Sequence, residues 1–416
     1  MKLAESSKYS LEGVTVIVPL ADEGLCLRMM RCLGQHGARF VLVSRSLDTA
    51  ASKSRYCERL VHLAGSQSDQ AWVNCLDRIE IDGDAAVLLP VTTAGFQFVA
   101  RNRVALSSRF HLPPLAEESS LRLASDKWSL FELADKVGLP VIRSVAMNAE
   151  SVAEIADGTD EFPFPLLIKP TRREHGRGFR KCDSAGELRS FYRETAAGGQ
   201  EDYLIQPFLD GYDVSVSAFC SSGRVRAHAT WEAQYYGGEH YTIPRCIEFK
   251  DGGENLEIAS SLLAHLDWEG VCDIDLFVDR RTGKTFLLEV NARFWANVIA
   301  CSVAGVNFPL LMCLAALDRT PQRWPTQVDE TVFCHPRGLP RLLTSRKNFW
   351  RAAKHPLSST GLDRILVDPF PEVYKARRRI CRSFSRSSLR QTRSERASSD
   401  SGSEWVDSTG SAHLPR

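Results

Sequence analysis

The segment from Val271 to Arg293, VCDIDLFVDRRTGKTFLLEVNAR, carries acidic and amide side chains on two β-rich runs. A polar turn at 279–284 separates the runs, which predicts two antiparallel neighbouring strands. Like charges that face each other across such a ladder are destabilising, and a cation between them relieves the repulsion. Carboxylate and amide oxygens suit Mg²⁺, which usually takes substrate phosphates as further ligands. The hairpin therefore predicts a Mg²⁺-nucleotide site with three metal ligands, Asp275, Glu289 and Asn291.

The register of this hairpin decides whether its two acids meet. Folding about the turn places Asp275 opposite Leu288 or Glu289, and an odd loop residue or a bulge would bring both carboxylates to one face. The sequence leaves that register open. The alternative is that both acids lie on the solvated face of an ordinary antiparallel sheet.

A second candidate site, rich in basic residues, precedes the hairpin. The apolar strand from Phe164 to Ile168 ends in Lys169 and is closed by Pro170. The ammonium group therefore leaves the strand at a fixed point, where it can contact phosphate oxygens. The next segment, 172–179, combines Arg with Gly, which is typical of a mobile loop that covers phosphates. An ordinary surface Lys at a strand end is the alternative.

The order of these segments resembles the ATP-grasp superfamily, of the carboxylate–amine ligase type. The hairpin ends in E-V-N-A-R, and the apolar run FWANVIACSVAGVNFPLLM follows it. Upstream lie a D-K-W motif at Lys127, the strand that ends in Lys169, and the linker YLIQPFLDGYDVSV. The resemblance covers about residues 120 to 318, and it rests on the order of the motifs, since none of them is decisive alone.

The resemblance implies phosphate contacts at two places. Lys127 would lie in the first turn of a helix with Ser125 or Asp126 as its N-cap, where a cation is disfavoured unless an anion lies nearby. A solvated surface Lys is the alternative. The segment 172–179 resembles the family's glycine-rich loop, with more Arg and fewer Gly than usual, and we assign its phosphate contact to Arg177, with Arg173 as the alternative.

The resemblance also implies a nucleoside site in the linker. The family has an E-x-x-x-x-G-x-E pattern here, with its first residue near the adenine amino group and its last on the ribose hydroxyls. In this chain those positions are Gln206 and Asp213, which retain acceptor oxygens. We expect Phe208 and Leu209 to contact adenine, because an extended apolar linker provides a flat slot for the base.

The chain departs from the family at one point that concerns the substrate. Some of these ligases carry an Arg two residues before the metal-binding Asp, where this chain has Asp273. Arg293 is then left at that end to contact an acyl phosphate or a substrate carboxylate. We therefore predict Arg293 and Arg177 as the catalytic residues.

The first part of the chain predicts strands that alternate with helices, which implies a doubly wound α/β unit. There is no G-x-G-x-x-G after the first strand, so a dinucleotide-binding domain is disfavoured. The arrangement resembles the domain that precedes an ATP-grasp core. The predicted strands are Val14–Val18, Phe40–Ser44 and Val87–Pro90, and the predicted helices run from Glu23 to His36 and from about Thr93 to Asn102.

Composition places the chain among globular proteins of more than one domain. It has 416 residues, of which 44% are apolar and 25% charged, and its formal net charge is +1. No run approaches the roughly 20 apolar residues of a membrane span, and the start lacks an apolar signal core, so we expect a cytoplasmic protein. Its 12 cysteines show no C-x-x-C pairs, and we expect reduced thiols.

These observations predict an α/β and α+β protein with four parts. They are a doubly wound pre-ATP-grasp domain at 1–118, a two-lobed ATP-grasp fold at 119–318, and an extension at 319–374 that packs on the core. A basic tail at 375–416 follows, with ten Lys and Arg against four Asp and Glu. We expect this tail to be disordered, because it has few large apolar residues.

The predicted activity is an ATP-dependent ligase that activates a carboxylate as an acyl phosphate and transfers it to an amine. Its cofactors would be ATP and Mg²⁺, with Mn²⁺ as a substitute, and its substrates small molecules such as amino acids. No nucleic-acid or membrane partner is indicated. Two alternatives stay open, a kinase that phosphorylates a hydroxyl on the same scaffold and a nucleotide-binding protein without turnover.

Overall fold

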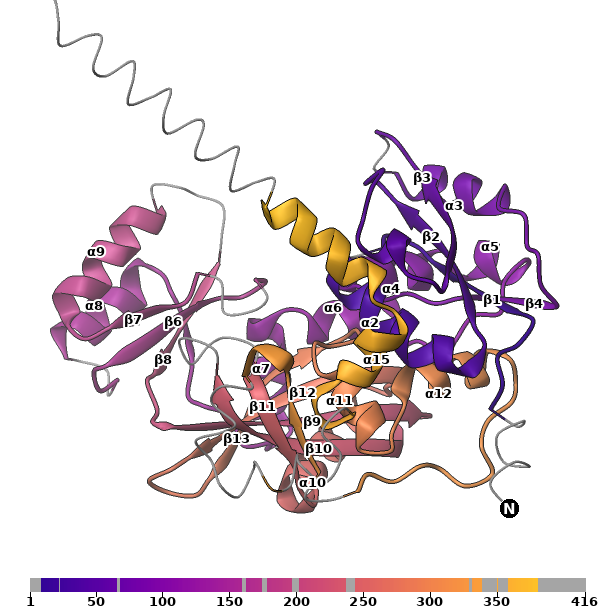
Figure 1. The fold of residues 1–416 in the computed structure, drawn as a ribbon. Coiled ribbons are helices and arrows are strands. Elements are labelled where there is room, and N and C mark those ends of the chain that lie inside the picture. The colour runs from indigo at the N-terminus through magenta and orange to yellow at the C-terminus, as the bar shows by residue number, and fades with distance from the viewer. Residues whose placement is uncertain are drawn as a thin grey trace, which may run out of the picture.

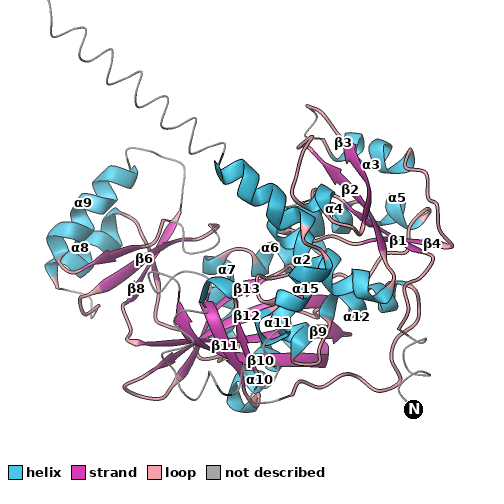
Figure 2. Ribbon diagram, in the orientation of Figure 1, coloured by secondary structure: helices cyan, strands magenta, loops and turns pink. Residues whose placement is uncertain are grey.

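The structure contains three β-sheets in the part of the chain that it describes (Figure 1). Helices pack against these sheets, and they come from different parts of the chain (Figure 2). It is a computed structural model, and the fold is mixed α/β. The described residues are 9–21, 23–65, 68–158, 162–173, 178–196, 202–236, 244–328, 331–338, 350 and 358–380.

The first sheet is parallel, with strand order β3-β2-β1-β4. Its central strand is the β-branched run VTVIV, which is buried along its whole length, as expected of a strand covered on both faces. All three predicted strands are confirmed; the first has the predicted ends, and the other two have ends shifted by one or two residues. The edge strand β3 was not predicted, because CERLVH mixes charged and apolar residues and is only half-buried. The elements are β1 (Val14–Val18), α2 (Glu23–Leu33), β2 (Arg39–Ser44), β3 (Cys57–His62), α3 (Asp69–Asp77), β4 (Ala85–Leu88), α4 (Thr93–Arg101) and α5 (Arg103–Ser107).

The second sheet forms a small antiparallel lobe with strand order β5-β8-β6-β7. Two helices cover one of its faces and share a separate apolar core with it (Figure 1). The first helix starts at a capping box, in which the Asn148 side chain accepts from the backbone N–H of Ser151 at 2.9 Å. The lobe consists of β5 (Val145–Ala146), α8 (Ala149–Asp157), β6 (Leu166–Pro170), β7 (Arg180–Cys182), α9 (Ala185–Ala196) and β8 (Tyr203–Pro207).

The third sheet is the largest and is antiparallel, with strand order β13-β12-β9-β10-β11-β14. Its apolar residues and those of the parallel sheet belong to one continuous core. The Asn307 amide also joins the two units, since it donates to the backbone carbonyl of Cys32 at 3.0 Å. The elements here are α6 (Glu118–Ala124), α7 (Lys127–Lys136), β9 (Gly211–Ser221), β10 (Arg224–Tyr236), β11 (Pro244–Phe249), α10 (Gly253–His265), β12 (Gly270–Asp279), β13 (Thr285–Asn291), α11 (Val298–Val303), α12 (Phe308–Ala316) and β14 (Val332–Cys334).

The predicted hairpin is confirmed as the β12–β13 pair, and its register is now fixed. Asp275 lies opposite Glu289, whereas Leu276 lies opposite Leu287, so Leu288 is an extra residue on β13. A bulge of this kind increases the local twist and redirects side chains. The bulge foreseen as one of the possibilities is therefore present, and the two acids are direct neighbours across the ladder.

The C-terminal segment returns to the parallel sheet. Helix α15 (Leu362–Val367) and a further helix at 370–380 lie against the first unit (Figure 1). The predicted start of a disordered tail at Lys375 is wrong, because this residue lies inside the second helix. Composition does not reveal the reason, which is that the preceding Tyr374 donates its hydroxyl to Asp48 at 2.6 Å. The rest of the predicted tail lies outside the described residues.

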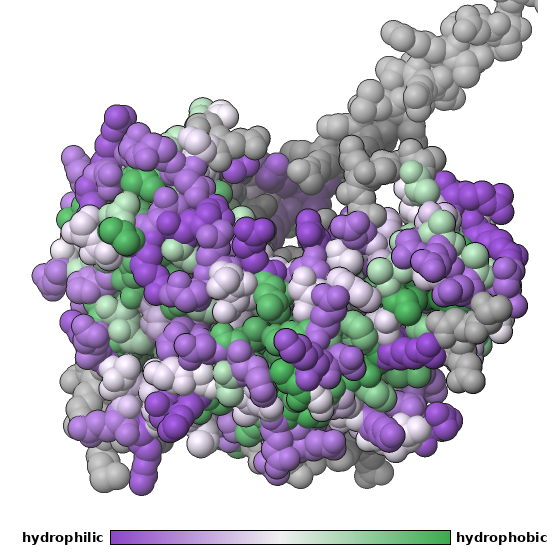
Figure 3. Space-filling view, turned by 180° about the vertical axis from the view of Figure 1, so that it is seen from behind, coloured by the Kyte–Doolittle hydropathy of each residue, from purple (hydrophilic) through white to green (hydrophobic). Residues whose placement is uncertain are grey.

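One face of the molecule shows how its polarity is distributed. Seen from behind, hydrophobic residues gather near the centre, and hydrophilic residues dominate the periphery (Figure 3). Among the described residues, no helix is both long enough and apolar enough to cross a bilayer. None of the eleven described cysteines forms a disulfide.

Candidate active site

A cavity of about 260 Å³ lies between the small lobe and the large sheet. Strands β6 and β8 of the lobe contribute one wall, and strands β9, β12 and β13 contribute the opposite wall. Ten of the eleven residues predicted for the site line this cavity. They are Lys127, Lys169, Gln206, Phe208, Leu209, Asp213, Asp275, Glu289, Asn291 and Arg293. The eleventh, Arg177, lies outside the described residues, as do residues 174–176 of its loop.

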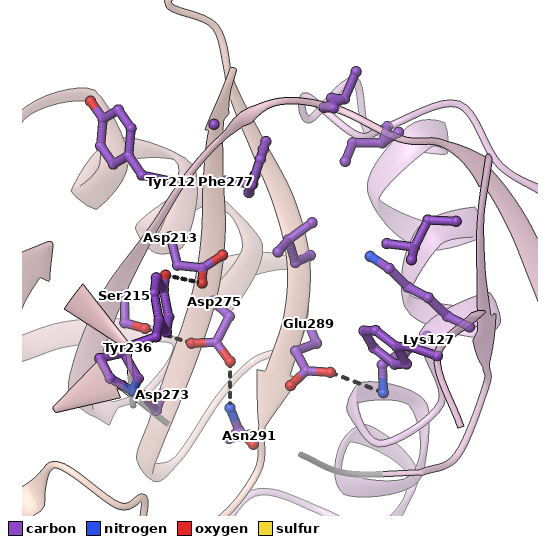
Figure 4. Close-up of a pocket in the computed structure, with 18 of the residues that line it drawn as sticks. Lys127, Tyr212, Asp213, Ser215, Tyr236, Asp273, Asp275, Phe277, Glu289 and Asn291 are labelled. Atoms are coloured by element: carbon purple, nitrogen blue, oxygen red, sulfur yellow. Dashed lines mark hydrogen bonds and ion pairs between the residues drawn. The ribbon is translucent and has the colours of Figure 1, made fainter. Parts of the chain in front are cut away.

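Asp275 is the centre of a hydrogen-bond cluster on the large sheet (Figure 4). The Ser215 hydroxyl on β9 donates to its Oδ1 atom, and the Asn291 amide on β13 donates to its Oδ2 atom at 2.9 Å. Burial raises the pKa of Asp275 well above its usual value, and the nearby acids Asp273 and Glu289 raise it further. A cation would relieve this repulsion.

Asp273 is a buried carboxylate next to this cluster, and it is 3% exposed. Its Oδ1 atom accepts from the Ser217 hydroxyl at 2.6 Å. Burial raises the pKa of Asp273 to about 7, although the Ser217 bond and the positive charge of Arg293 act in the opposite direction. The departure from the family pattern thus adds a third acid to this end of the cavity.

The donor set fits a hard divalent cation. Asp275 and Glu289 offer carboxylate oxygens, and Asn291 directs its amide nitrogen to Asp275, which leaves its amide oxygen for a cation. Within the described ranges, no three His, Cys, Asp or Glu side chains form a ready metal cluster. A mixed carboxylate and amide set with room for water and phosphate ligands suits Mg²⁺ better than a closed protein cage.

Lys127 faces the hairpin from helix α7. The helix begins there because Asp126 caps it, accepting from the backbone N–H of Trp128 at 3.1 Å and of Ser129 at 3.0 Å. The Lys127 ammonium forms an ion pair with Glu289 at 2.9 Å (Figure 4) and donates to the Arg173 carbonyl at 2.8 Å. The first-turn cation therefore has the anionic neighbour that its position requires.

Glu289 is held in its charged form by the cations around it. Burial acts to raise its pKa, but Lys127, Lys169 and Arg293 outweigh burial and lower the pKa below its usual value. The two acids of the hairpin thus differ, since Asp275 has a raised pKa and Glu289 a lowered one. A metal ion or a phosphate that enters here must compete with the Lys127–Glu289 pair.

Lys169 lies at the end of strand β6 and is 7% exposed. Burial lowers its pKa to about 8 from the usual 10.5, partly offset by the negative charge of Glu289. Its ammonium lies over the ring of Phe179 at 5.5 Å. The nearby negative charge does not compensate for the burial of this cation, so the phosphates of a nucleotide would bind favourably beside it.

The linker between β8 and β9, where the adenine slot is predicted, lines the cavity. The Gln206 amide nitrogen donates to Ser144 at 2.7 Å, and its buried oxygen has no hydrogen-bond partner among the described residues. The backbone N–H of Phe208 donates to Pro165 at 2.9 Å, and the Lys181 ammonium lies over the Phe208 ring at 5.0 Å. Gln206 thus retains an unused acceptor, as the prediction of an adenine contact requires.

Two predicted residues already have partners within the protein. Asp213 accepts a hydrogen bond from the Tyr236 hydroxyl (Figure 4), and burial together with Asp213 raises the pKa of that tyrosine. Arg293 is 5% exposed and donates to the carbonyl of Phe294 at 2.8 Å. A ribose at Asp213 would therefore share or displace the Tyr236 contact.

Several residues of the cavity were not predicted individually. Ser215, together with Ser217, which hydrogen-bonds the cavity residue Asp273, could have been found, because D-V-S-V-S on β9 alternates in the same way as D-I-D on β12. The aromatic walls carry no such signal, since their place depends on how the lobe and the sheet meet. These walls include Phe179, Tyr212, Trp231, Tyr236, Phe277 and Trp295.

Two family models match the region around the cavity. One is described as ATP-grasp in the biosynthetic pathway with Ter operon and matches residues 199–333. The other is the carbamoyl-phosphate synthase L chain, ATP binding domain, and matches residues 126–214. The two matches together run from the cap of α7 to β14.

Curated proteins of known activity are similar over about half of the chain. The carbamoyl phosphate synthase large chain of Deinococcus radiodurans is 29% identical over 203 residues, which cover 47% of this chain and 19% of that protein. A D-alanine–D-alanine ligase of Pseudomonas putida is 24% identical over 203 residues, 46% of this chain and 63% of that protein. The chain thus spans less than two thirds of either relative.

Solved structures extend the likeness to most of the fold. An N5-carboxyaminoimidazole synthetase of Staphylococcus aureus, complexed with ADP, has a TM-score of 0.61 at 12% identity and covers 82% of this chain and 87% of its own. An L-amino acid ligase of Bacillus licheniformis has a TM-score of 0.56 at 16% identity and covers 74% of each chain. These likenesses show a shared fold, and the two family models with the curated relatives place the chain in the ATP-grasp superfamily.

Proposed function

We propose that the chain is an ATP-dependent ligase, which activates a carboxylate as an acyl phosphate and transfers it to an amine. The observation that carries this proposal is the pairing of Asp275 with Glu289 across the bulged hairpin, opposite the ammonium groups of Lys127 and Lys169. Acids on one wall and cations on the other match the needs of a nucleotide triphosphate and its metal ion.

ATP would lie between the lobe and the large sheet. The linker 207–210 would hold adenine, with the free oxygen of Gln206 as an acceptor for its amino group. Asp213 would accept from the ribose hydroxyls, and Lys169 and Lys127 would contact the phosphates. We assign a further phosphate contact to Arg177, whose loop follows Lys169 in the sequence.

The metal ligands in this proposal are Asp275, Glu289 and Asn291. Mg²⁺, or Mn²⁺ in its place, would neutralise phosphate charge at this wall. Ser215 and Asn291 orient the Asp275 carboxylate through their hydrogen bonds. Because these hydrogen bonds already orient the ligands, the binding of the cation costs little further side-chain entropy.

Catalysis would depend on positioning and charge. Arg293 lies two residues after Asn291 and so is placed to hold an anionic acceptor next to the γ-phosphate. The substrate carboxylate would attack the γ-phosphorus and release ADP, and the amine would then attack the acyl carbon and release phosphate. The aromatic walls exclude water, which protects an acyl phosphate from hydrolysis.

The N-terminal unit would form the wall for the acceptor substrate. We propose that residues 1–118 are a doubly wound pre-ATP-grasp domain, whose ligands gather at the carboxyl ends of the parallel strands. Helix α4 follows one such end, and its Phe96 ring packs on Phe294 with 6.0 Å between centroids. Phe294 is the neighbour of Arg293, so this unit borders the proposed acceptor site.

Trapping the intermediate tests the proposal. With a pool of amino acids and small acids as substrates and hydroxylamine in large excess over their amino groups, a hydroxamate is expected to form together with ADP. A stable phosphorylated product without hydroxamate would indicate the kinase alternative, because a phosphate ester does not react with hydroxylamine. ATP binding without substrate-dependent ADP release would indicate a nucleotide-binding protein without turnover.

A further inference from the structure

The last helices of the described chain have an unusual polarity. A surface helix normally turns its apolar stripe to the core and its charges to solvent. Nine large apolar residues are exposed in the described part of the protein, and five of them lie between 366 and 380. They are Leu366, Val367, Phe370, Val373 and Ile380, with exposures from 43% to 66%.

The inner face of this segment is polar and already occupied. Asp368 is fully buried, and its carboxylate accepts from the Ser54 hydroxyl and the Arg55 backbone N–H, both at 2.9 Å. Glu372 forms an ion pair with Arg31 at 3.2 Å. The segment is thus docked on the parallel sheet unit through charges, and this docking fixes its apolar residues on the outside.

The apolar residues follow helical spacing. Phe370, Val373 and Ile380 recur at intervals of three and seven, which places them along one stripe of the helix at 370–380. Arg377 lies four residues after Val373 and therefore on the same side. A stripe of this kind, bordered by cations, is typical of helices that lie in the plane of a membrane surface.

The positive charge of the segment that starts at residue 375 indicates which class of partner it binds. Arg377 lies on the side of the stripe, Arg378 and Arg379 are exposed next to it in the sequence, and the sequence from 375 to 396 has nine Lys and Arg against one Glu. Nucleic acid would account for the arginines but leaves the exposed phenylalanine and aliphatic residues without a role. An anionic lipid surface uses both, since its acyl boundary takes the apolar side chains and its headgroups take the cations.

We propose that the face formed by Phe370, Val373, Arg377 and Ile380 binds an anionic lipid surface while the inner face stays docked on the protein. The contact is peripheral, because these helices are too short to cross a bilayer. It is independent of the proposed ligase activity. Its effect is to hold the enzyme at a surface without any change in the cavity between lobe and sheet.

Flotation of the full chain with phosphatidylcholine vesicles, with and without phosphatidylglycerol, tests the proposal. Binding is expected only with the anionic lipid and is expected to weaken as salt rises. The variant Phe370→Ser/Val373→Ser is expected to bind at least about tenfold more weakly, because two apolar side chains no longer enter the lipid. Replacement of Arg377, Arg378 and Arg379 by Gln is expected to weaken binding by roughly fivefold for each arginine.

The matched control is Val104→Ser, because Val104 is 89% exposed on α5, outside this face. It is expected to bind vesicles as the unchanged chain does, and all variants are expected to melt at the same temperature. Equal binding to neutral vesicles, no binding at low salt, or full binding by Phe370→Ser/Val373→Ser would overturn the proposal. Tighter binding to a short DNA duplex than to anionic vesicles would assign the surface to nucleic acid instead.

Discussion

Asp275 and Glu289 face each other across the β12–β13 ladder, and the extra residue Leu288 on β13 sets this register. The pair is asymmetric, because burial and neighbouring acids raise the pKa of Asp275, whereas Lys127 and two further cations lower that of Glu289. Lys127 in turn starts the helix that links the large sheet to the small lobe. One hairpin therefore joins the proposed metal site to the proposed phosphate site.

We expect Glu289→Gln to abolish turnover while the fold is retained. The amide keeps the shape of the side chain but loses the charge that faces Lys127 and the proposed metal ion. The rate of ADP release is expected to fall by a factor on the order of 10² to 10³. The control Glu254→Gln changes an exposed acid on α10 and is expected to keep full activity. Turnover of the Glu289 variant at the normal rate would refute the site assignment.

Lys169→Ala is expected to weaken the binding of Mg-ATP. The ammonium is buried and lacks enough negative charge around it, so the phosphates are its natural partner. Loss of one charge-assisted contact is expected to raise the Kd by roughly tenfold or more, as measured by titration calorimetry. Lys181→Ala, on the same lobe but half-exposed, removes a cation of the lobe and is expected to have a smaller effect. Unchanged affinity in the Lys169 variant would contradict the phosphate role.

The pH dependence of ATP binding gives an independent check on Lys169. Its pKa in the free protein is lowered to about 8, and phosphates stabilise the charged form. Affinity is therefore expected to be constant below pH 8 and to fall above it, by up to about tenfold per pH unit. Lys169→Arg stays charged and is expected to flatten this dependence. A pH-independent Kd between pH 8 and 10 in the unchanged protein would show that the ammonium is not the contact.

Raising the pH has the opposite effect on the contribution of Lys169 to folding stability. Because the folded pKa of Lys169 lies below the usual value of 10.5, the charged form is disfavoured in the folded state. The unfolded chain binds more protons between pH 8 and 10.5, so this group adds stability as pH rises through that window. Calorimetric melting of the nucleotide-free protein is expected to show this contribution, and Lys169→Met is expected to remove it.

The sequence predicted residue types and order well, but it did not predict how separate parts meet. Period-two alternation is a local property, so the hairpin and its ligand set could be found before any fold was known. Its register depends on the bulge at Leu288 and on pairing with β9, where Asp275 lies opposite Ser215. The partners of Lys127 and Asp213 are also non-local, because Glu289 and Tyr236 reach them from other elements. Composition misplaced the tail for the same reason, since docking at Asp48 extends the order past Lys375.

Asp368 is expected to be essential for stability. Its buried carboxylate accepts from Ser54, Arg55 and Arg31, which belong to a unit more than 300 residues earlier in the chain. Asp368→Ala leaves the buried Arg31 guanidinium without the carboxylate that faces it. The variant is expected to lose about 3–5 kcal/mol of the free energy of unfolding, measured in urea. Asp183→Ala removes an exposed ion pair with Lys181 and is expected to cost less than about 1 kcal/mol. Equal losses in the two variants would rule out the docking role.

A chain that ends at Tyr374 is expected to fold with an unchanged melting temperature and to bind ATP normally. It retains Asp368, Glu372 and the Tyr374 hydroxyl on Asp48, and of the described residues it loses the half-buried Lys375, which pairs with Glu372, and the exposed residues 376–380. A chain that ends at residue 357 loses all three contacts and is expected to melt several degrees lower, because each kcal/mol shifts the melting point of a protein this size by roughly 2 °C. Both chains are compared by calorimetry with and without Mg-ATP. If the chain that ends at Tyr374 already melts several degrees below the full chain, residues after Tyr374 pack on the core, and the contacts of Asp368, Glu372 and Tyr374 do not by themselves explain the stability of this region.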